Sequence, residues 1–278
     1  MVPKQTEKME EIWQACLSWA LEKDPDFARQ YQRMGFGKEP CALEDLPRLP
    51  ELSITGSESP FERLNLPLSS LERWIGKTAY LTQEIDVWKD CAQSWLRSCG
   101  IHRASVVLVA DGFDGAGAAW GILEGIRSMG AVVMTNGAAP WEIADMYGIT
   151  ACALTAELLG KWVASGRKPA CCRQIFCLTS DLDAVRRDQW QAALGVPIYR
   201  QIGLEGIQAS AIFWEDRARK GYRYLPQYYV PELVGDSNGP GRKLLLTALQ
   251  RRSTTAIRMR TDRTAAWQQD PSRRLLYL

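Results

Sequence analysis

Strand-like and helix-like segments alternate along residues 83–210, and this alternation constrains the fold more than any other feature of the chain. Short apolar runs such as ASVVLVA, AVVM, TACALT and QIFCLTS have the length and composition of buried strands. Stretches with helical spacing separate them, and several of these stretches end in glycine. Strands that alternate with helices imply a mainly parallel sheet covered on both faces. The sequence therefore predicts a doubly wound α/β core.

The segments on either side of this core have different patterns. Residues 7–35 have the spacing of two packed helices broken at a DPD turn, and a proline-rich irregular stretch follows them. After Ile212 the segments AIFWED, GYRYLPQYYVPELV and KLLLTAL read as β-strands joined by turns. We therefore expect four parts: a helical N-terminal segment with a loop region (1–82), the α/β core (83–210), a β-rich closing part (211–262) and a tail (263–278).

Charge and hydropathy exclude several classes of function. The 34 basic residues nearly balance the 32 acidic ones, so we expect neither nucleic acid nor a membrane surface as a partner. No apolar run reaches the roughly 20 residues that span a bilayer, and the N-terminus is too polar for a secretory signal. These features predict a cytoplasmic protein whose partners are small molecules or other proteins.

The cysteines and the single histidine do not form a recognisable chemical site. The eight cysteines contain no CxxC pair, so we expect buried thiols in a reducing compartment and no metal site. His102 lies in a short GIHR turn without a nucleophile motif, which argues against Ser–His or Cys–His catalysis. No catalytic residue can be assigned from these residue types.

Two glycine-containing segments resemble nucleotide-binding loops but fail on spacing. The GKT at Gly76–Thr78 would need another glycine at Leu71 and a preceding strand to form a Walker loop. In DGFDGAGAAWG, Gly115 and Gly117 fit the first two positions of GxGxxG, but the third position is Trp120. The next strand also ends without the acidic residue that would hold a ribose. A plain Walker site and an NAD or FAD site are therefore both disfavoured.

The order of four segments carries a resemblance to a known family. SSLERWIGKTAYLTQEIDVW, DGFDGAGAAWG, SMGAVVM and KLLLTALQRRSTTAIRMRTD follow one another along the chain. Their order and spacing resemble the large N-terminal domain of the acyl-adenylate-forming superfamily, most closely its phenylacetate–CoA ligase branch, over residues 40–262. The resemblance implies the fold of that domain, ATP with magnesium and CoA as cofactors, and a small, aromatic carboxylic acid as substrate.

The resemblance places nucleotide contacts on three segments. Residues 66–82 take the position of the family's phosphate loop, with GTTG replaced by LERW. IGLEG takes the position of YGxTE: Gly203 matches, Ile202 replaces the aromatic residue near adenine, and Glu205 lies one place from the magnesium position. In RMRTD, Asp262 corresponds to the aspartate that binds ribose, without the glycine that precedes it. The implied nucleotide-binding candidates are Ser69, Ser70, Lys77, Thr78, Gly203, Glu205 and Asp262.

These replacements predict impaired ATP chemistry. Leu71 and Trp74 are bulky and Glu72 is anionic, so they oppose the close approach of backbone N–H groups to a polyphosphate. Relatives also continue into a smaller lid domain that carries the adenylation lysine and shapes the CoA tunnel, and residues 263–278 are too few to form one. We therefore expect a lone chain to be an inefficient ligase, with a lid supplied by a partner chain or by a homodimer.

The predicted acyl pocket lies where the strand ends converge, because ligands of open α/β sheets bind beyond the carboxyl ends of the strands. The residues expected to line it are Phe113, Gly115, Trp120, Ile202 and Leu204. The alternative is that the aromatic side chains only fill core space.

Three functions remain open from the sequence. The first is a ligase-like enzyme that activates a small, aromatic acid. The second is a non-catalytic acyl-binding or assembly subunit on the same fold. The third is an enzyme that uses an acyl group already activated elsewhere.

Overall fold

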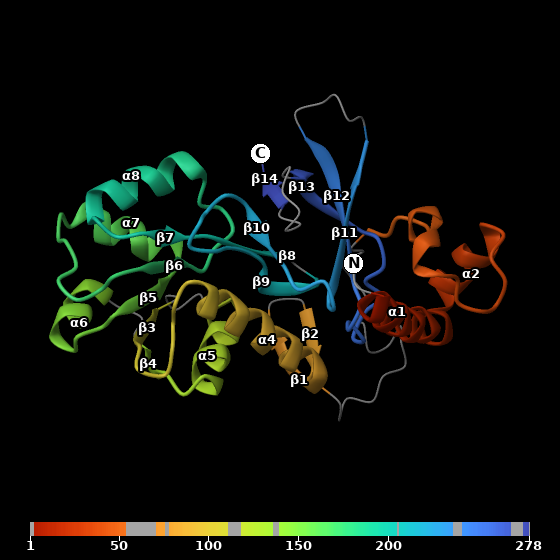
Figure 1. The fold of residues 1–278 in the computed structure, drawn as a ribbon, viewed down its shortest axis with the longest axis horizontal. Helices are drawn as coiled ribbons and strands as arrows, with labels where there is room; N and C mark the ends of the chain where they lie inside the picture. The colour runs from red at the N-terminus through yellow and green to blue at the C-terminus, as the bar shows by residue number, and fades with distance from the viewer. Residues whose placement is uncertain are drawn as a thin grey trace. The chain divides into compact units, whose positions relative to one another are not determined.

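The computed structural model describes residues 3–53, 71–75, 78–110, 118–135, 139–204, 206–235, 241–267 and 275–277. The chain forms two compact units (Figure 1). The first unit comprises Met1–Val87, Leu225–Trp267 and Leu276–Leu278, and the second comprises Trp88–Tyr224 and Gln268–Leu275. The chain thus leaves the first unit and returns to it.

The first unit begins with helices. The expected helix pair is present as α1 (Pro3–Lys23) and α2 (Pro25–Arg33), followed by a 3-10 helix, η1 (Leu43–Arg48). Asp24 separates the two helices because its carboxylate accepts a hydrogen bond of 3.1 Å from Phe27 N and so caps α2, which has proline at its first position. The apolar faces of these helices form a core with the segment after β12, made of Trp13, Cys16, Leu17, Ala20, Phe27, Tyr31, Leu46, Leu49, Leu249 and Ile257.

The strands of the first unit are antiparallel. β1 (Leu71–Ile75) pairs with β2 (Thr78–Leu81), and α4 (Thr82–Ser98) begins immediately afterwards. β11 (Tyr229–Val234), β12 (Arg242–Ala248) and β13 (Met259–Trp267) form a meander with the register Leu233↔Leu244 and Leu246↔Met259. The β-rich part expected near the C-terminus is present.

The second unit contains the predicted parallel sheet. Its strands are β3 (Val106–Ala110), β4 (Val132–Thr135), β5 (Ala151–Leu154), β6 (Ile175–Cys177) and β7 (Ile198–Tyr199), in the order β4-β3-β5-β6-β7. The connecting helices are α5 (Ala118–Ser128), α6 (Pro140–Met146), α7 (Ala156–Ala164) and α8 (Ala184–Leu194). The strand order changes direction after β4, so right-handed crossovers place helices on both faces. The sequence prediction of a doubly wound, mainly parallel sheet is confirmed.

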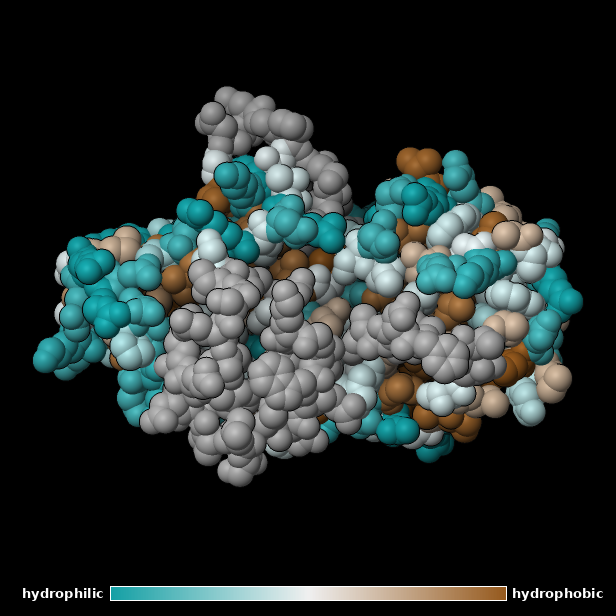
Figure 2. All heavy atoms as spheres, turned by 180° about the vertical axis from the view of Figure 1, so that it is seen from behind, coloured by the Kyte–Doolittle hydropathy of each residue, from teal (hydrophilic) through white to brown (hydrophobic). Residues whose placement is uncertain are grey.

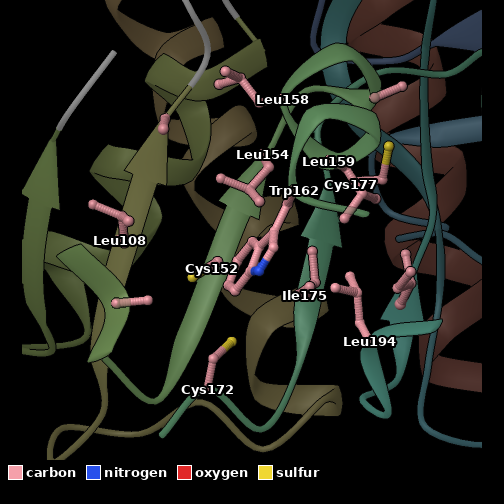
Figure 3. Close-up of a cluster of buried hydrophobic side chains, with 14 of the residues drawn as sticks. Leu108, Cys152, Leu154, Leu158, Leu159, Trp162, Cys172, Ile175, Cys177 and Leu194 are labelled. Atoms are coloured by element: carbon pink, nitrogen blue, oxygen red, sulfur yellow. The ribbon is translucent and has the colours of Figure 1, made fainter. Parts of the chain in front are cut away.

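Buried apolar side chains fill the space between this sheet and its helices (Figure 3). β5 is buried at every position, and the Trp162 ring from α7 lies against it. Large apolar side chains remain exposed at six described positions, namely Met34, Val132, Met146, Tyr147, Val185 and Trp267. Hydrophilic and apolar residues are interspersed on the face drawn in Figure 2. None of the helices that the structure describes is long and apolar enough to cross a bilayer.

An antiparallel group follows the parallel sheet within the second unit. β8 (Gln201–Leu204) pairs with β9 (Gln208–Glu215), and β9 with β10 (Tyr222–Arg223). Tyr222 of β10 pairs with Leu275, where the second unit ends and β14 (Leu275–Tyr277) begins. The sequence pattern predicts one strand over VPIYRQIG, whereas the structure has two, with Arg200 between them. Arg200 N donates to the buried Glu215 carboxylate at 2.9 Å, and this side-chain bond interrupts the ladder where the chain leaves one sheet for the other.

Candidate functional site

Gly203 lies on β8 at a point where two backbones approach closely. A Cβ atom at this position would lie 2.0 Å from Ala209 O, so no residue with a side chain fits without displacing the strand. Gly203 N donates to Ser180 Oγ at 3.1 Å, and Ser180 follows the carboxyl end of β6. The predicted residue Gly203 therefore stands beside the carboxyl edge of the parallel sheet, where α/β proteins bind ligands.

Gln201 joins β8 to the same edge. Its amide nitrogen donates to Leu178 O, and its amide oxygen accepts a hydrogen bond of 2.7 Å from Ala211 N. Ala211 has a positive φ of 58°, an uncommon conformation for a residue other than glycine. These bonds fix the β8–β9 hairpin against the end of β6. The sequence pattern gave no sign of Gln201, because a glutamine in an apolar strand carries no spacing signal.

The predicted acyl-pocket residues fall into two groups. Ile202 and Leu204 are buried on β8, and Trp120 is half-buried on α5 with its ring 5.5 Å from that of Trp88. Trp88 Nε1 donates to Ser210 Oγ at 2.8 Å, and Ser210 lies on β9 opposite the Gly203 region. A chain of contacts therefore connects Trp120 with the β8–β9 hairpin. Phe113 and Gly115 lie outside the described residues, and a pocket lined by these five residues stays a prediction.

The stretch that the resemblance aligns with the family's phosphate loop has regular secondary structure where it is described. Trp74 pairs with Ala79 and Ile75 with Thr78, so that LERW belongs to β1. The resemblance implies a loop over this stretch, whereas the structure has LERWI and TAYL as an antiparallel pair of strands. Thr78 opens β2. The other candidates in this part of the site, Ser69, Ser70 and Lys77, lie outside the described residues, as does Glu205.

A buried carboxylate that sequence reasoning missed holds this hairpin in place. Glu84 Oε2 accepts hydrogen bonds of 2.8 Å from Leu81 N and from Arg251 Nη1. Glu84 Oε1 accepts bonds of 2.6 Å from Arg252 N and 2.8 Å from Ser253 N. Both side chains of the Glu84–Arg251 ion pair are only 4% exposed. A glutamate at the third position of a helix is half of a capping box, and this was the one available signal.

Arg251 completes the network around the hairpin. Its Nη2 donates to Ala79 O at 2.6 Å, the same oxygen that accepts from Ser253 Oγ at 2.9 Å. The guanidinium carbon lies 4.5 Å from the centroid of the Tyr80 ring, at cation–π distance. We call Glu84, Arg251, Ser253 and Ala79 the hairpin clamp. It joins β2 and the start of α4 to the segment that follows β12.

Asp262 differs from the clamp because it faces solvent. It lies within β13, its side chain is 82% exposed, and it forms an ion pair of 3.5 Å with Arg263. Nearby Arg258 is buried, has φ of 48° and pairs with Glu232 at 3.2 Å. Burial raises the pKa of the Glu232 carboxyl, and the Arg258 charge opposes that shift. Asp262 is therefore available to a ligand, whereas Arg258 stabilises the strand.

Within the described ranges, no three His, Cys, Asp or Glu side chains are grouped as they would be around a metal ion. The sequence-predicted candidates accordingly divide between the two units. Gly203, Ile202, Leu204 and Trp120 belong to the second unit, and Thr78 and Asp262 belong to the first.

Comparison with known proteins reveals similarity of fold. No family model matches the sequence, and no curated protein matches it. The chain is similar to 2-hydroxyisobutyryl-CoA ligase, solved in an open conformation with 2-HIB-AMP and CoA: the TM-score is 0.82 at 17% identity, over 99% of this chain and 73% of the ligase chain. It is also similar to O-succinylbenzoate coenzyme A synthetase from Bacillus subtilis, solved with AMP, with a TM-score of 0.54 at 11% identity over 75% and 48% of the two chains. Over the matched residues, the chain therefore has the fold of these two CoA ligases.

Proposed function

We propose that this protein binds a small, aromatic carboxylic acid, or the same acyl group already activated, and that its ATP chemistry is impaired. The observation that carries the proposal is the pairing of LERW with β2 in the position of the phosphate loop. A phosphate loop works through backbone N–H groups that are free to surround the phosphates. In a two-stranded antiparallel ladder, alternate N–H groups donate to the partner strand and are not free to do so, and an extended strand spaces the others along one edge.

The acyl half of the proposal is supported by the second unit. Ile202 and Leu204 offer buried apolar side chains beside Gly203, at the edge of the sheet where ligands of this fold class bind. The two similar structures are acid–CoA ligases by name. The preference for an aromatic acid comes from the resemblance to the phenylacetate–CoA ligase branch.

The nucleotide half is supported by the loss of separate contacts. The pairing of LERW with β2 engages part of its N–H groups, and Ile202 offers no ring to stack on adenine. Asp262 remains available for a ribose, but one hydrogen-bonded group contributes only about 1–3 kcal/mol. We expect Mg-ATP to bind with millimolar affinity at best, which corresponds to about 4 kcal/mol.

The test combines calorimetry with a turnover assay. Mg-ATP, benzoate-like acids and their CoA thioesters are titrated separately, and pyrophosphate release is measured with a panel of aryl acids. Acid or thioester binding without micromolar ATP binding supports the proposal. Micromolar ATP binding with acid-dependent pyrophosphate release contradicts it and restores an active ligase.

A matched pair of variants locates the acyl site. Ile202→Ala removes side-chain volume at the proposed pocket, and Ile257→Ala makes the same change in the core of the first unit. We expect only Ile202→Ala to weaken binding of the acid, while both variants lose stability. If both variants lose the same affinity for the acid, the loss comes from reduced stability and does not locate the acyl site at Ile202.

The second candidate is a non-catalytic acyl-binding or assembly subunit. The strand in the position of the phosphate loop favours this candidate too, since binding an acyl group requires no donors to phosphate. If the protein is such a subunit, we expect it to bind the acid and to release no pyrophosphate at any protein concentration. If a homodimer or a partner chain supplies a lid, pyrophosphate release appears on association, and this outcome selects the enzyme.

A further inference from the structure

Two cysteines from neighbouring elements meet in the core of the second unit. Cys152 lies on β5, and Cys172 lies in the segment that leads into β6 (Figure 3). Cys152 N donates to Gln174 O at 3.1 Å, and Cys172 Sγ donates to the same oxygen at 3.2 Å. Both side chains belong to the same buried cluster, and Figure 3 draws them on adjacent segments. Both cysteines are free in this structure.

The two thiols are chemically unequal. The interaction between the two side chains lowers the pKa of the Cys172 thiol and raises the pKa of the Cys152 thiol. Burial instead raises the pKa of Cys99 to about 12 and that of Cys177 to about 11. The thiolate is the nucleophile in thiol chemistry, so Cys172 is placed to react first and Cys152 second.

Cys172 is buried, whereas Cys171 just before it is half-buried and Ala170 is exposed. Cys172 is 3% exposed, and the chain that precedes it is exposed at Gly166–Lys168. This stretch between α7 and β6 is irregular, and such segments open locally at lower cost than core strands. A small oxidant can therefore reach Cys172 through local opening that leaves the sheet intact.

We propose that Cys152 and Cys172 are a redox modification site that forms an intramolecular disulfide with a peroxide. The Cys172 sulfur attacks one peroxide oxygen, forming an S–O bond, breaking the O–O bond and releasing water that carries the thiol proton. The Cys152 sulfur then attacks the sulfenic sulfur, forming the S–S bond and releasing a second water. The peroxide is reduced and the two thiols are oxidised.

The disulfide would close a loop that contains α7, between β5 and the start of β6. Closing this loop restricts the unfolded chain, so the oxidised protein should unfold at a higher temperature than the reduced protein. The proposal does not depend on the acyl-binding function, and the test needs no activity.

The experiment treats the full chain with hydrogen peroxide, blocks free thiols, and maps peptides by mass spectrometry without reduction. We expect a cross-linked peptide pair joining Cys152 and Cys172, lighter by two hydrogen atoms and lost on reduction. Cys172→Ser should abolish the cross-link and the rise in melting temperature. Cys177→Ser is the matched control, since Cys177 is buried in the same core, and it should keep both.

The wild-type peptide map decides the question even if a variant fails to fold. Oxidation of Cys172 to sulfinic acid without the cross-link overturns the proposal. So does a cross-link that joins Cys171 in place of Cys172, or one that persists in Cys172→Ser.

Discussion

Replacing Glu84 by glutamine should destabilise the first unit strongly. The glutamate accepts four hydrogen bonds, two on each carboxylate oxygen. A glutamine keeps the shape but has only one oxygen, so its NH₂ group must face two donors whichever way the amide is turned. Those donors are either Leu81 N with Arg251, or Arg252 N with Ser253 N.

The expected cost follows from burial. In the better orientation two backbone N–H groups lose their acceptor, at about 1–3 kcal/mol each. Arg251, which is 4% exposed, also loses its countercharge, and breaking a buried ion pair costs about 3–5 kcal/mol. The loss of acceptors and the loss of the ion pair concern the same carboxylate, so their costs are not additive. We expect Glu84→Gln to lower the free energy of unfolding by about 4 kcal/mol. A typical domain is stable by only about 5–15 kcal/mol.

The assay is urea unfolding followed by circular dichroism, together with hydrogen exchange of the β2 amides. Glu51→Gln is the control, because Glu51 pairs with Arg260 at 2.8 Å but with side chains 32% and 62% exposed. Exposed pairs contribute at most about 1 kcal/mol, so the control should change little. The reasoning fails if the free energies of unfolding of Glu84→Gln and Glu51→Gln differ by less than about 1 kcal/mol and the β2 amides stay protected from exchange. The hairpin clamp would then not hold the hairpin.

Three further predictions concern single positions. Gly203→Ala should lower the melting temperature and cost more than about 2 kcal/mol of stability, because the new Cβ would lie 2.0 Å from Ala209 O. Gly37→Ala is the control: a Cβ there has open space, so the melting temperature should not fall. Burial raises the pKa of Cys177 to about 11, so iodoacetamide near neutral pH should alkylate it only after unfolding. Burial also raises the pKa of Tyr31 to about 12. The shift therefore contributes fully to the free energy of unfolding below the ordinary tyrosine pKa of about 10, and this contribution is lost as the pH rises towards 12. Tyr31→Phe should remove this pH dependence from urea unfolding curves.

The parallel core could be predicted because its signal is local. Each strand of the second unit is a short buried run beside a helix with its own periodicity, and periodicity needs no information about distant residues. The division of VPIYRQIG into β7 and β8 could not be predicted. Arg200 sits at the break because its N–H is bound by Glu215, a residue on a different strand.

Within the described residues, the candidate site could be predicted only at a position where the local backbone leaves room for one residue type. The family motif singles out Gly203, and the structure shows a backbone contact there that only glycine allows; its role in binding a nucleotide stays a prediction. The hairpin clamp was missed because Glu84 and Arg251 are 167 positions apart in the chain. No spacing rule connects such residues, and the pairing of LERW with TAYL was hidden for a related reason. A short apolar stretch can be read as a strand or as a loop that has lost its glycines.

The positions that match the family motifs do not carry equal weight as evidence for a nucleotide. Gly203 has a sufficient structural reason in Ala209 O, and Arg258 has one in Glu232, so either residue would be expected here without any ligand. Asp262 is different, since its side chain is 82% exposed and its ion pair with Arg263 is too exposed to contribute much to stability. Exposed aspartates are common on protein surfaces, so the match of Asp262 to a ribose-binding position stays a prediction that only a binding measurement tests. Asp262→Asn should therefore leave the melting temperature unchanged, and any weak Mg-ATP binding that calorimetry detects should decrease in this variant. Residual ATP binding that is equal in the wild type and in Asp262→Asn would mean that the match at Asp262 is inherited from the fold alone.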